Sequence, residues 1–241
     1  TGIPPYFKRM YVCLADVREG FLDGCRKYLG LDGCFLKGVV NEHLKVDIRT
    51  KDGGEWTFMS DKQKGLLNEV QAIFPQAEHR LCARHIYAIW YLNFRGEQMK
   101  LAFYSIAKCA NEAQLRQRLD EIDSIQTGAK QSLENKDINK WCRAFFKSGT
   151  KCDCVDNNST EAWNYVLIYA RSMPIISMNE SIRECLMERR IQRINFASKW
   201  KLDCGPNIMD IMNENCTAGC KWKIKWNGAD EFQVYYGRTQ H

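Results

Sequence analysis

The pattern of apolar residues changes near Cys82, and this change constrains the fold more than any other feature of the chain. From Tyr28 to Ile48, short runs rich in Leu, Val, Phe and Ile lie between Gly and Asn residues, a pattern typical of strands and turns. From 82 to 147 the apolar residues recur with helical spacing instead. The sequence therefore predicts an α/β fold in which a small sheet is followed by an all-helical insertion.

The first part of the chain predicts two helices and four strands. A helix-like stretch over 7–25 comes first, and two antiparallel strands are expected within 28–48. After the turn KDGGE, a third strand over 56–59 ends at Ser60 and Asp61, and AEHRL gives a last short strand. Between these two strands, 61–73 has the spacing of a helix that ends before Pro75.

The last part predicts two helices and a hairpin. One helix is expected over 157–173, ended by Pro174, and another over 175–200. The tail alternates Lys with Trp or Ile and then resumes after an Asn-Gly turn, which is typical of a β-hairpin. The predicted domains are an N-terminal helical segment (1–27), a sheet core (28–81), a helical insertion (82–156), C-terminal core helices (157–203) and a tail with the hairpin (204–241).

Composition indicates a globular, intracellular protein. Of the 241 residues 45% are hydrophobic, enough for a sizeable core, yet the apolar runs are too short for a membrane span or a signal peptide. No membrane partner is expected. The first residue, Thr1, and the final GRTQH suggest a fragment of a longer protein. The 12 cysteines are spread over the chain without a secretory signal, which predicts thiols rather than disulfides.

Positive charge is concentrated in one segment. The net charge of +6 suits a polyanionic partner without requiring one. Over 181–201 basic residues outnumber acidic ones, and this segment is either a DNA-binding surface or a solvated helix face. The basic residues are Arg183, Arg189, Arg190, Arg193, Lys199 and Lys201.

Three acidic residues are candidate metal ligands. Two-metal phosphodiester chemistry needs carboxylates that converge from different elements, and Asp32, Asp61 and Glu161 sit on three different predicted elements. Each has a structural alternative: Asp32 precedes Gly33 and could belong to a turn, whereas Asp61 and Glu161 could each cap a helix.

Cys82 and His85 form a C-x-x-H pair, which could supply two ligands of a zinc site but does not complete one. A closed zinc site takes four ligands, and no second local pair supplies the rest. His79 lies three residues before Cys82, and the pairs Cys152 with Cys154 and Cys216 with Cys220 could contribute from elsewhere in the fold.

Four motifs occur in a fixed order: LDGCFLKG, TFMSDKQKGLL, EHRLCARHIYAIW and NNSTEAWN. Together they resemble the transposase domain of plant Mutator-like elements and of the far-red-response regulators domesticated from them, from about Tyr6 to the end. The resemblance implies a ribonuclease H-like core and nuclear DNA as partner. It also implies that Asp32, Asp61 and Glu161 hold Mg²⁺ or Mn²⁺ to cut and join DNA strands. The C-x-x-H accompanies these acids near the active site, and a homo-oligomer is compatible with the family.

The segment between Asp32 and Asp61 is shorter than the family pattern, as if one strand and one crossover helix were deleted. We therefore expect a reduced mixed sheet, an apolar face open to solvent, low solubility and impaired catalysis. The residues expected on or near that face are Leu29, Leu31, Phe35, Leu44, Val46, Trp56 and Phe58. Two alternatives stay open: a domesticated DNA-binding transcriptional regulator without catalysis, and a degraded gene product.

Overall fold

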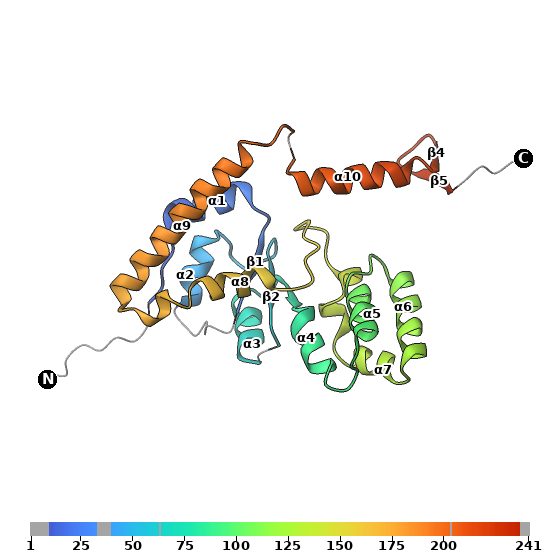
Figure 1. The fold of residues 1–241 in the computed structure, drawn as a ribbon, viewed down its shortest axis with the longest axis horizontal. Coiled ribbons are helices and arrows are strands. Elements are labelled where there is room, and N and C mark those ends of the chain that lie inside the picture. Colours follow the sequence, from blue (N-terminus) through green and yellow to red (C-terminus); the bar gives the residue numbers. More distant parts are fainter. Residues whose placement is uncertain (1–9, 33–39, 63, 203, 237–241) are drawn as a thin grey trace, which may run out of the picture. The chain divides into compact units, whose positions relative to one another are not determined.

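The computed structural model describes residues 10–32, 40–62, 64–202 and 204–236, and it divides into two compact units (Figure 1). The first unit runs to Val166 and the second begins at Leu167. This division falls inside the predicted segment 157–203. The first unit is a mixed α/β structure that contains the candidate site. The second holds two helices and a small antiparallel hairpin.

The sheet of the first unit has three parallel strands. They are β1 (Tyr28–Gly30), β2 (Thr57–Ser60) and β3 (Glu78–Leu81), in the order β1-β2-β3. Residues Leu29 and Phe58 are register partners, as are Ser60 and Leu81. All three strands run in the same direction, so their carboxyl ends lie along one edge of the sheet. The predicted strand over 56–59 and the strand in AEHRL are confirmed, but the described sheet is parallel rather than mixed.

The second predicted strand is a helix in the structure. The helix α2 (Val40–Asp47) connects β1 to β2, and α3 (Lys64–Ile73) connects β2 to β3 as predicted. The alternation of Leu44, Val46 and Ile48 suggested a strand. However, Leu44 and Ile48, four residues apart, pack into the core while Val46 is 74% exposed. This is the spacing of one helical face, so burial of that face outweighs the strand preference of the β-branched residues.

One face of the sheet is covered by α1 (Ala15–Gly24), α2 and α3. Its core contains Trp56 and Phe58 at 2% and 0% exposure. Leu29, Leu31 and Leu44 pack against this core as partly buried residues. The expectation of an apolar face open to solvent is therefore wrong for these five residues, because α2 provides the cover that a crossover helix would give. Val46 is exposed as a residue of the outer helix surface, and Phe35 lies outside the described residues.

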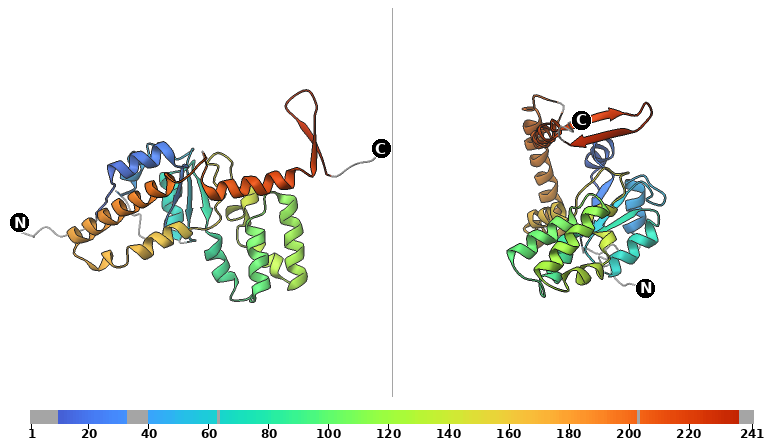
Figure 2. Two further views of the ribbon diagram at one scale, coloured as in Figure 1. Left: turned by 45° about the horizontal axis from the view of Figure 1, so that its top comes forward. Right: turned by 90° about the vertical axis from the view of Figure 1, so that its right-hand side faces the viewer.

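The helical insertion lies beside the sheet (Figure 2), and its side chains form a second core that includes Leu81 of β3. Its helices are α4 (Ala83–Trp90), α5 (Glu97–Ala107), α6 (Glu112–Ile125) and α7 (Ala129–Glu134), followed by the short 3₁₀ turns η1 (Ile138–Lys140) and η2 (Arg143–Phe145). Phe103 and Trp141 stack at its centre, with ring centroids 5.1 Å apart and both side chains fully buried. The predicted all-helical block is confirmed, and its core joins the sheet through Leu81.

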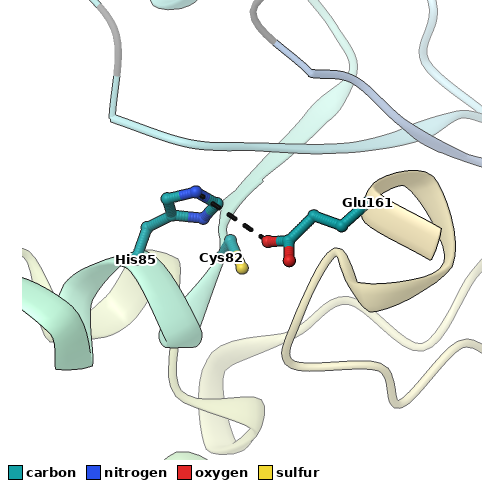
Figure 3. A group of neighbouring side chains, drawn as sticks. All are labelled: Cys82, His85 and Glu161. Carbon is teal, nitrogen blue, oxygen red and sulfur yellow. Dashed lines mark ion pairs between the residues drawn. The ribbon is translucent and has the colours of Figure 1, made fainter. Parts of the chain in front are cut away.

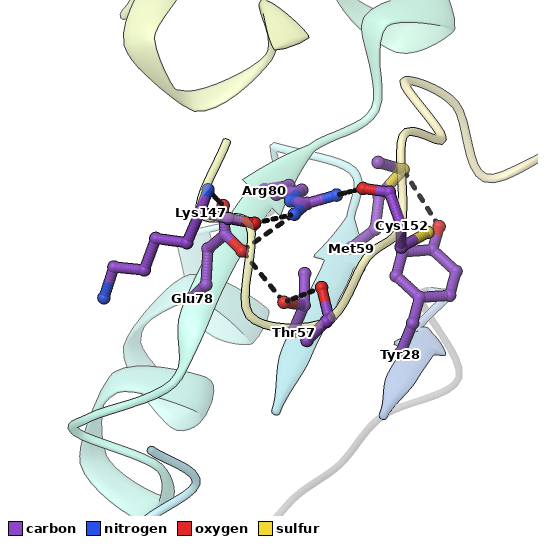
Figure 4. Close-up of polar contacts among 8 residues, drawn as sticks. Tyr28, Thr57, Met59, Glu78, Arg80, Lys147 and Cys152 are labelled. Carbon is purple, nitrogen blue, oxygen red and sulfur yellow. Dashed lines mark hydrogen bonds and ion pairs between the residues drawn. The ribbon is translucent and has the colours of Figure 1, made fainter. Parts of the chain in front are cut away.

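The chain that leaves the helical block is tied to the other face of the sheet by Arg80 (Figure 4). The Arg80 guanidinium is 1% exposed and donates to the backbone oxygens of Cys152 and Lys147, at 2.6 and 3.3 Å. It also pairs with Glu78 at 2.8 Å, and Glu78 in turn accepts from Thr57 and from the backbone of Lys147. These bonds fix the path of the chain between the block and the next helix.

That next helix, α8 (Asn158–Val166), packs directly against β1. A Cβ atom at Gly30 would overlap the side-chain oxygens of Asn157 and Thr160, so only glycine permits this close approach. The predicted single helix over 157–173 is instead two pieces. After α8 ends at Val166, a turn leads to the 3₁₀ turn η3 (Ala170–Ser172), and no Gly or Pro marks the break.

The second unit contains α9 (Ile175–Ala197), α10 (Pro206–Gly219) and the strands β4 (Trp222–Trp226) and β5 (Phe232–Tyr236). The strands form the predicted antiparallel hairpin. No helix among the described residues combines the length and the apolar character that crossing a bilayer requires. Helix α10 had no counterpart among the predicted elements. It begins with Pro206, a residue favoured at the first helical position.

Candidate functional site

The carboxyl ends of the three parallel strands carry three of the predicted site residues. Asp61 and Cys82 directly follow β2 and β3, and Asp32 follows β1 by two residues. The backbone hydrogen bonds between the strands continue past the strand ends. The N–H of Leu31 donates to the oxygen of Met59 at 2.7 Å, and the N–H of Cys82 donates to the oxygen of Ser60 at 2.8 Å. The backbone therefore delivers Asp32, Asp61 and Cys82 to one edge, side by side.

Helix α8 lies against this edge with one polar face. Asn157, Glu161 and Asn164 recur at helical spacing and face the sheet and α4. Asn157 donates from its side chain to the oxygen of Leu31 at 2.9 Å, and Asn164 donates to the carboxylate of Asp32. Glu161, between them, pairs with residues of α4. The structure thus brings the helix that carries Glu161 to the strand end that carries Asp32.

Glu161, Cys82 and His85 form a group that could hold a metal ion (Figure 3). One ligand atom from each residue lies within 4.8 Å of the other two. Cys82 precedes α4 and His85 lies in its first turn, three residues later, so both side chains face the same side. The imidazole Nε2 is 3.9 Å from Glu161 Oε1. Within the described parts of the chain, this is the one group of three or more such ligands.

Arg84 fixes the orientation of Glu161. Its guanidinium pairs with Glu161 Oε2, the carboxylate oxygen that does not face His85, and donates to the side chain of Asn158 at 3.1 Å. The carboxylate of Glu161 therefore turns toward α4 instead of closing the cap of its own helix. The capping alternative for Glu161 is wrong, because its partners lie on another element.

The thiol of Cys82 is fully buried and accepts a hydrogen bond from the backbone N–H of Asn157 at 3.2 Å. Burial raises the pKa of Cys82, while the backbone N–H groups of Asn157, His85 and Arg84 act in the opposite direction. The thiolate is the form that ligates metals, and N–H donors around the sulfur stabilise it. Every described cysteine is a free thiol, as the sequence predicts.

Asp61 has a buried oxygen without a hydrogen-bond partner among the described residues. Its neighbour Ser60 donates to the backbone oxygen of Asp61 and contacts His79 Nε2 at 2.7 Å. His79 is therefore engaged with Ser60 rather than with the Cys82 group. An unpaired buried carboxylate oxygen is costly, and a cation at the sheet edge would satisfy it. The capping box of Ser60 with Gln63 lies outside the described residues.

The remaining predicted residues lie elsewhere. Cys152 and Cys154 hydrogen-bond each other, and this bond is the largest cause that lowers the pKa of Cys152 to about 6. Neither belongs to the metal-binding group. Cys216 and Cys220 lie in and just after α10 of the second unit. The basic residues Arg183, Arg189, Arg190 and Arg193 lie on α9, and Lys199 and Lys201 follow its end.

Sequence reasoning missed three functional residues, namely Asn157, Asn164 and Arg84. Asn157 and Asn164 recur with the predicted Glu161 every three to four residues, so the polar face of α8 was visible in the motif NNSTEAWN. Arg84 had no comparable signal, because its role depends on how α8 packs against α4.

No protein-family model matches the chain, and no curated protein matches it either. The resemblance to Mutator-like transposases therefore depends on the four motifs alone.

Proposed function

We propose that the chain is a DNA-binding domain of Mutator-like transposase ancestry with a ribonuclease H-like core and weak metal-dependent strand cleavage. The observation that carries this proposal is the placement of Asp32 and Asp61 at neighbouring strand ends, with the helix of Glu161 hydrogen-bonded to the end that carries Asp32. Carboxylates from separate elements at one edge are what two-metal phosphodiester chemistry requires.

The ions that fit this edge are Mg²⁺ or Mn²⁺, which prefer carboxylate oxygens. Asp32, Asp61 and Glu161 would hold them, and the unpartnered oxygen of Asp61 suits a ligand position. Such ions activate an attacking oxygen and stabilise the leaving oxygen. The protein's own part is positioning: Asn164 holds Asp32, and Arg84 holds Glu161.

Those same contacts support weak rather than full activity. The Asp32 carboxylate accepts from Asn164, and the Glu161 carboxylate is ion-paired with Arg84, so both must reorganise before they can share an ion with Asp61. Metal sites lose activity when their ligands are displaced by about 1 Å. The second candidate function is a DNA-binding regulator without catalysis, and the ion pair that holds Glu161 on Arg84 favours it.

DNA binding would use the basic residues of α9. At about 100° per residue, Arg183, Arg189, Arg190 and Arg193 fall within an arc of about 120°, while Glu180, Glu184 and Glu188 occupy a separate stripe. Arg183 pairs with Glu180 at 3.0 Å. A one-sided stripe of guanidinium groups can contact successive phosphates, and such contacts carry no base specificity.

The test combines nicking with binding. Purified protein with Mg²⁺ or Mn²⁺ should nick supercoiled DNA slowly. Asp61→Asn should abolish nicking, while Asp23→Asn, which changes an exposed acid on α1, should leave it intact. Replacing Arg189, Arg190 and Arg193 with Gln should weaken DNA binding. The slope of log K against log salt concentration should fall by the equivalent of up to about three phosphate contacts. Salt-independent binding, or nicking that survives Asp61→Asn, would contradict the proposal.

A further inference from the structure

We propose that Cys82, His85 and Glu161 bind one zinc ion, and that this ion competes with the Mg²⁺ or Mn²⁺ of the sheet edge for Glu161. The zinc site itself is independent of the proposed function, whereas the competition rests on it.

The geometry of the three ligand atoms is close to that of a zinc site. They lie within 4.8 Å of one another, and tetrahedral zinc with ordinary bond lengths separates its ligands by about 3.4–3.6 Å. An adjustment of about 1 Å would close the site. The Cys82 backbone is fixed by bonds to Ser60 and to the first turn of α4, so the longer, partly exposed side chain of Glu161 is the one that adjusts.

The donor set selects zinc over magnesium. A thiolate and an imidazole are soft and borderline ligands that suit zinc, whereas Mg²⁺ prefers an all-oxygen set. The group has three protein ligands among the described residues. A water or substrate oxygen would take the fourth position, as in zinc sites that keep one position open.

The surroundings of the three residues resemble the outer ligand sphere of a metal site. Arg84 holds Glu161 Oε2 and leaves Oε1 facing His85, so a zinc ion could bind Oε1 without displacing the arginine. The backbone N–H of Asn157 donates to Cys82 Sγ. Such contacts orient ligands and tune their basicity.

A separate observation points to a missing partner at His85. Its Nδ1 atom is buried and has no hydrogen-bond partner among the described residues, although most buried polar atoms have one. The imidazole is therefore not held in place by the protein's own hydrogen bonds at that nitrogen. A metal ion bound at Nδ1, with the proton on Nε2, would give this buried nitrogen its missing partner.

The competition follows from the position of Glu161 between the two sites. On α8 it lies one turn from Asn164, which bonds to Asp32, and its carboxylate faces Cys82 and His85. A carboxylate drawn onto zinc by Cys82 and His85 is no longer available to Asp32 and Asp61. Zinc would therefore lower the affinity of the sheet edge for Mn²⁺.

The zinc site is tested with Co²⁺ on the metal-depleted full chain, because cobalt bound to a thiolate has a characteristic charge-transfer absorption. We expect one Co²⁺ to bind with this absorption, zinc to displace it, and excess Mg²⁺ not to do so. Cys82→Ser should abolish the absorption, and Cys25→Ser, which changes an exposed thiol outside the group, should preserve it. Glu161→Gln should keep the absorption but weaken binding at least about tenfold.

Since Cys82 is buried, His85→Gln serves as a second variant at a partly exposed side chain, and it should also weaken Co²⁺ binding at least about tenfold. The zinc site would be refuted if the wild-type protein with Co²⁺ lacked the thiolate absorption. It would also be refuted if Cys82→Ser kept that absorption or if His85→Gln bound Co²⁺ with wild-type affinity.

The competition is measured by Mn²⁺ binding, followed by electron paramagnetic resonance. One equivalent of Zn²⁺ should weaken Mn²⁺ binding to the wild type but not to Cys82→Ser. Equal effects on both proteins, or no Mn²⁺ binding at all, would refute the competition. Asp61→Asn separates this proposal from the proposed function, because it should abolish nicking and leave Co²⁺ binding unchanged.

Discussion

The side chain of Asn157 donates a 2.9 Å hydrogen bond to the backbone oxygen of Leu31, joining the start of α8 to the end of β1 across 126 positions of the chain. Its own side-chain oxygen accepts from Thr160 at 2.7 Å, and its backbone N–H donates to Cys82 Sγ. Asn157 is 2% exposed. This one residue therefore connects β1, α8 and the metal-binding group.

Replacing Asn157 with Ala should destabilise the first unit by about 1–3 kcal/mol. The change removes both side-chain hydrogen bonds and leaves the Leu31 oxygen without its donor. Urea unfolding measures the loss. Asn135→Ala, at an exposed position after α7, should change stability by no more than about 0.5 kcal/mol. Equal effects of the two substitutions would contradict the connecting role of Asn157.

Gly30→Ala should displace α8 and weaken Co²⁺ binding together with stability. The added methyl group overlaps side-chain oxygens of Asn157 and Thr160, so the helix that carries Glu161 must move. Gly20→Ala is the matched control. Gly20 lies inside α1 with no atom near the position of the new Cβ, and the change should stabilise the protein by about 0.5–1 kcal/mol. Thermal unfolding and cobalt titration of both variants check this. A Gly30→Ala protein with wild-type cobalt affinity would show that α8 does not depend on the close approach.

Breaking the buried ion pair of Arg80 with Glu78 should lower the free energy of unfolding more than breaking an exposed ion pair. Arg80→Met leaves a mostly buried carboxylate and should cost about 3–5 kcal/mol. The double variant with Glu78→Gln should cost less than the sum of the single changes, because neither charge is then left alone. The exposed pair of Arg116 with Glu112 on α6 is the control, and its loss should cost under about 0.5 kcal/mol. Additive single effects at Arg80 and Glu78, measured by urea unfolding, would mean that the two residues act separately.

His79 should make the first unit less stable in mild acid. Burial lowers the pKa of His79 from 6.5 to about 4, so the folded protein holds a neutral ring where the unfolded chain binds a proton. Stability is thus full above about pH 6.5 and falls toward pH 4, by about 3 kcal/mol in total.

Unfolding free energies of the wild type and His79→Gln across this range give the test. Carboxylates such as Asp47, whose pKa is lowered by hydrogen bonds from Tyr11 and Arg18, lose stabilisation in acid in both proteins. The difference between the two curves therefore isolates His79. A difference that does not vary with pH would exclude this role.

The sequence predicts those parts of the fold that depend on local pattern. The strand before Asp61, the helix before Pro75 and the Asn-Gly hairpin are set by apolar spacing and turn residues, and all three are present. The segment HLKVDI was misread because β-branched residues at alternate positions favour a strand. The core under α2 instead buries Leu44 and Ile48, which only a helix places together.

The sequence predicts the residues of the candidate site but not which of them lie together. Cys82, His85 and Glu161 were all singled out, yet Glu161 was assigned to the two aspartates, and the structure places its carboxylate beside the C-x-x-H pair. That orientation is set by the ion pair with Arg84 and by the close packing of the start of α8 against Gly30. Both contacts join residues far apart in the sequence, so no local pattern reveals them.

The parallel sheet and the site differ in when they can form. Each described strand pairs with the next one along the chain, with one helix between them among the described residues, so the sheet needs only residues up to Leu81. The contact between Asn157 and Cys82 spans 75 positions and that between Asn157 and Leu31 spans 126. During synthesis, which proceeds from the N-terminus, the helical block must emerge before α8 can arrive. The edge that carries Asp32, Asp61 and Cys82 therefore remains open to water until α8 docks.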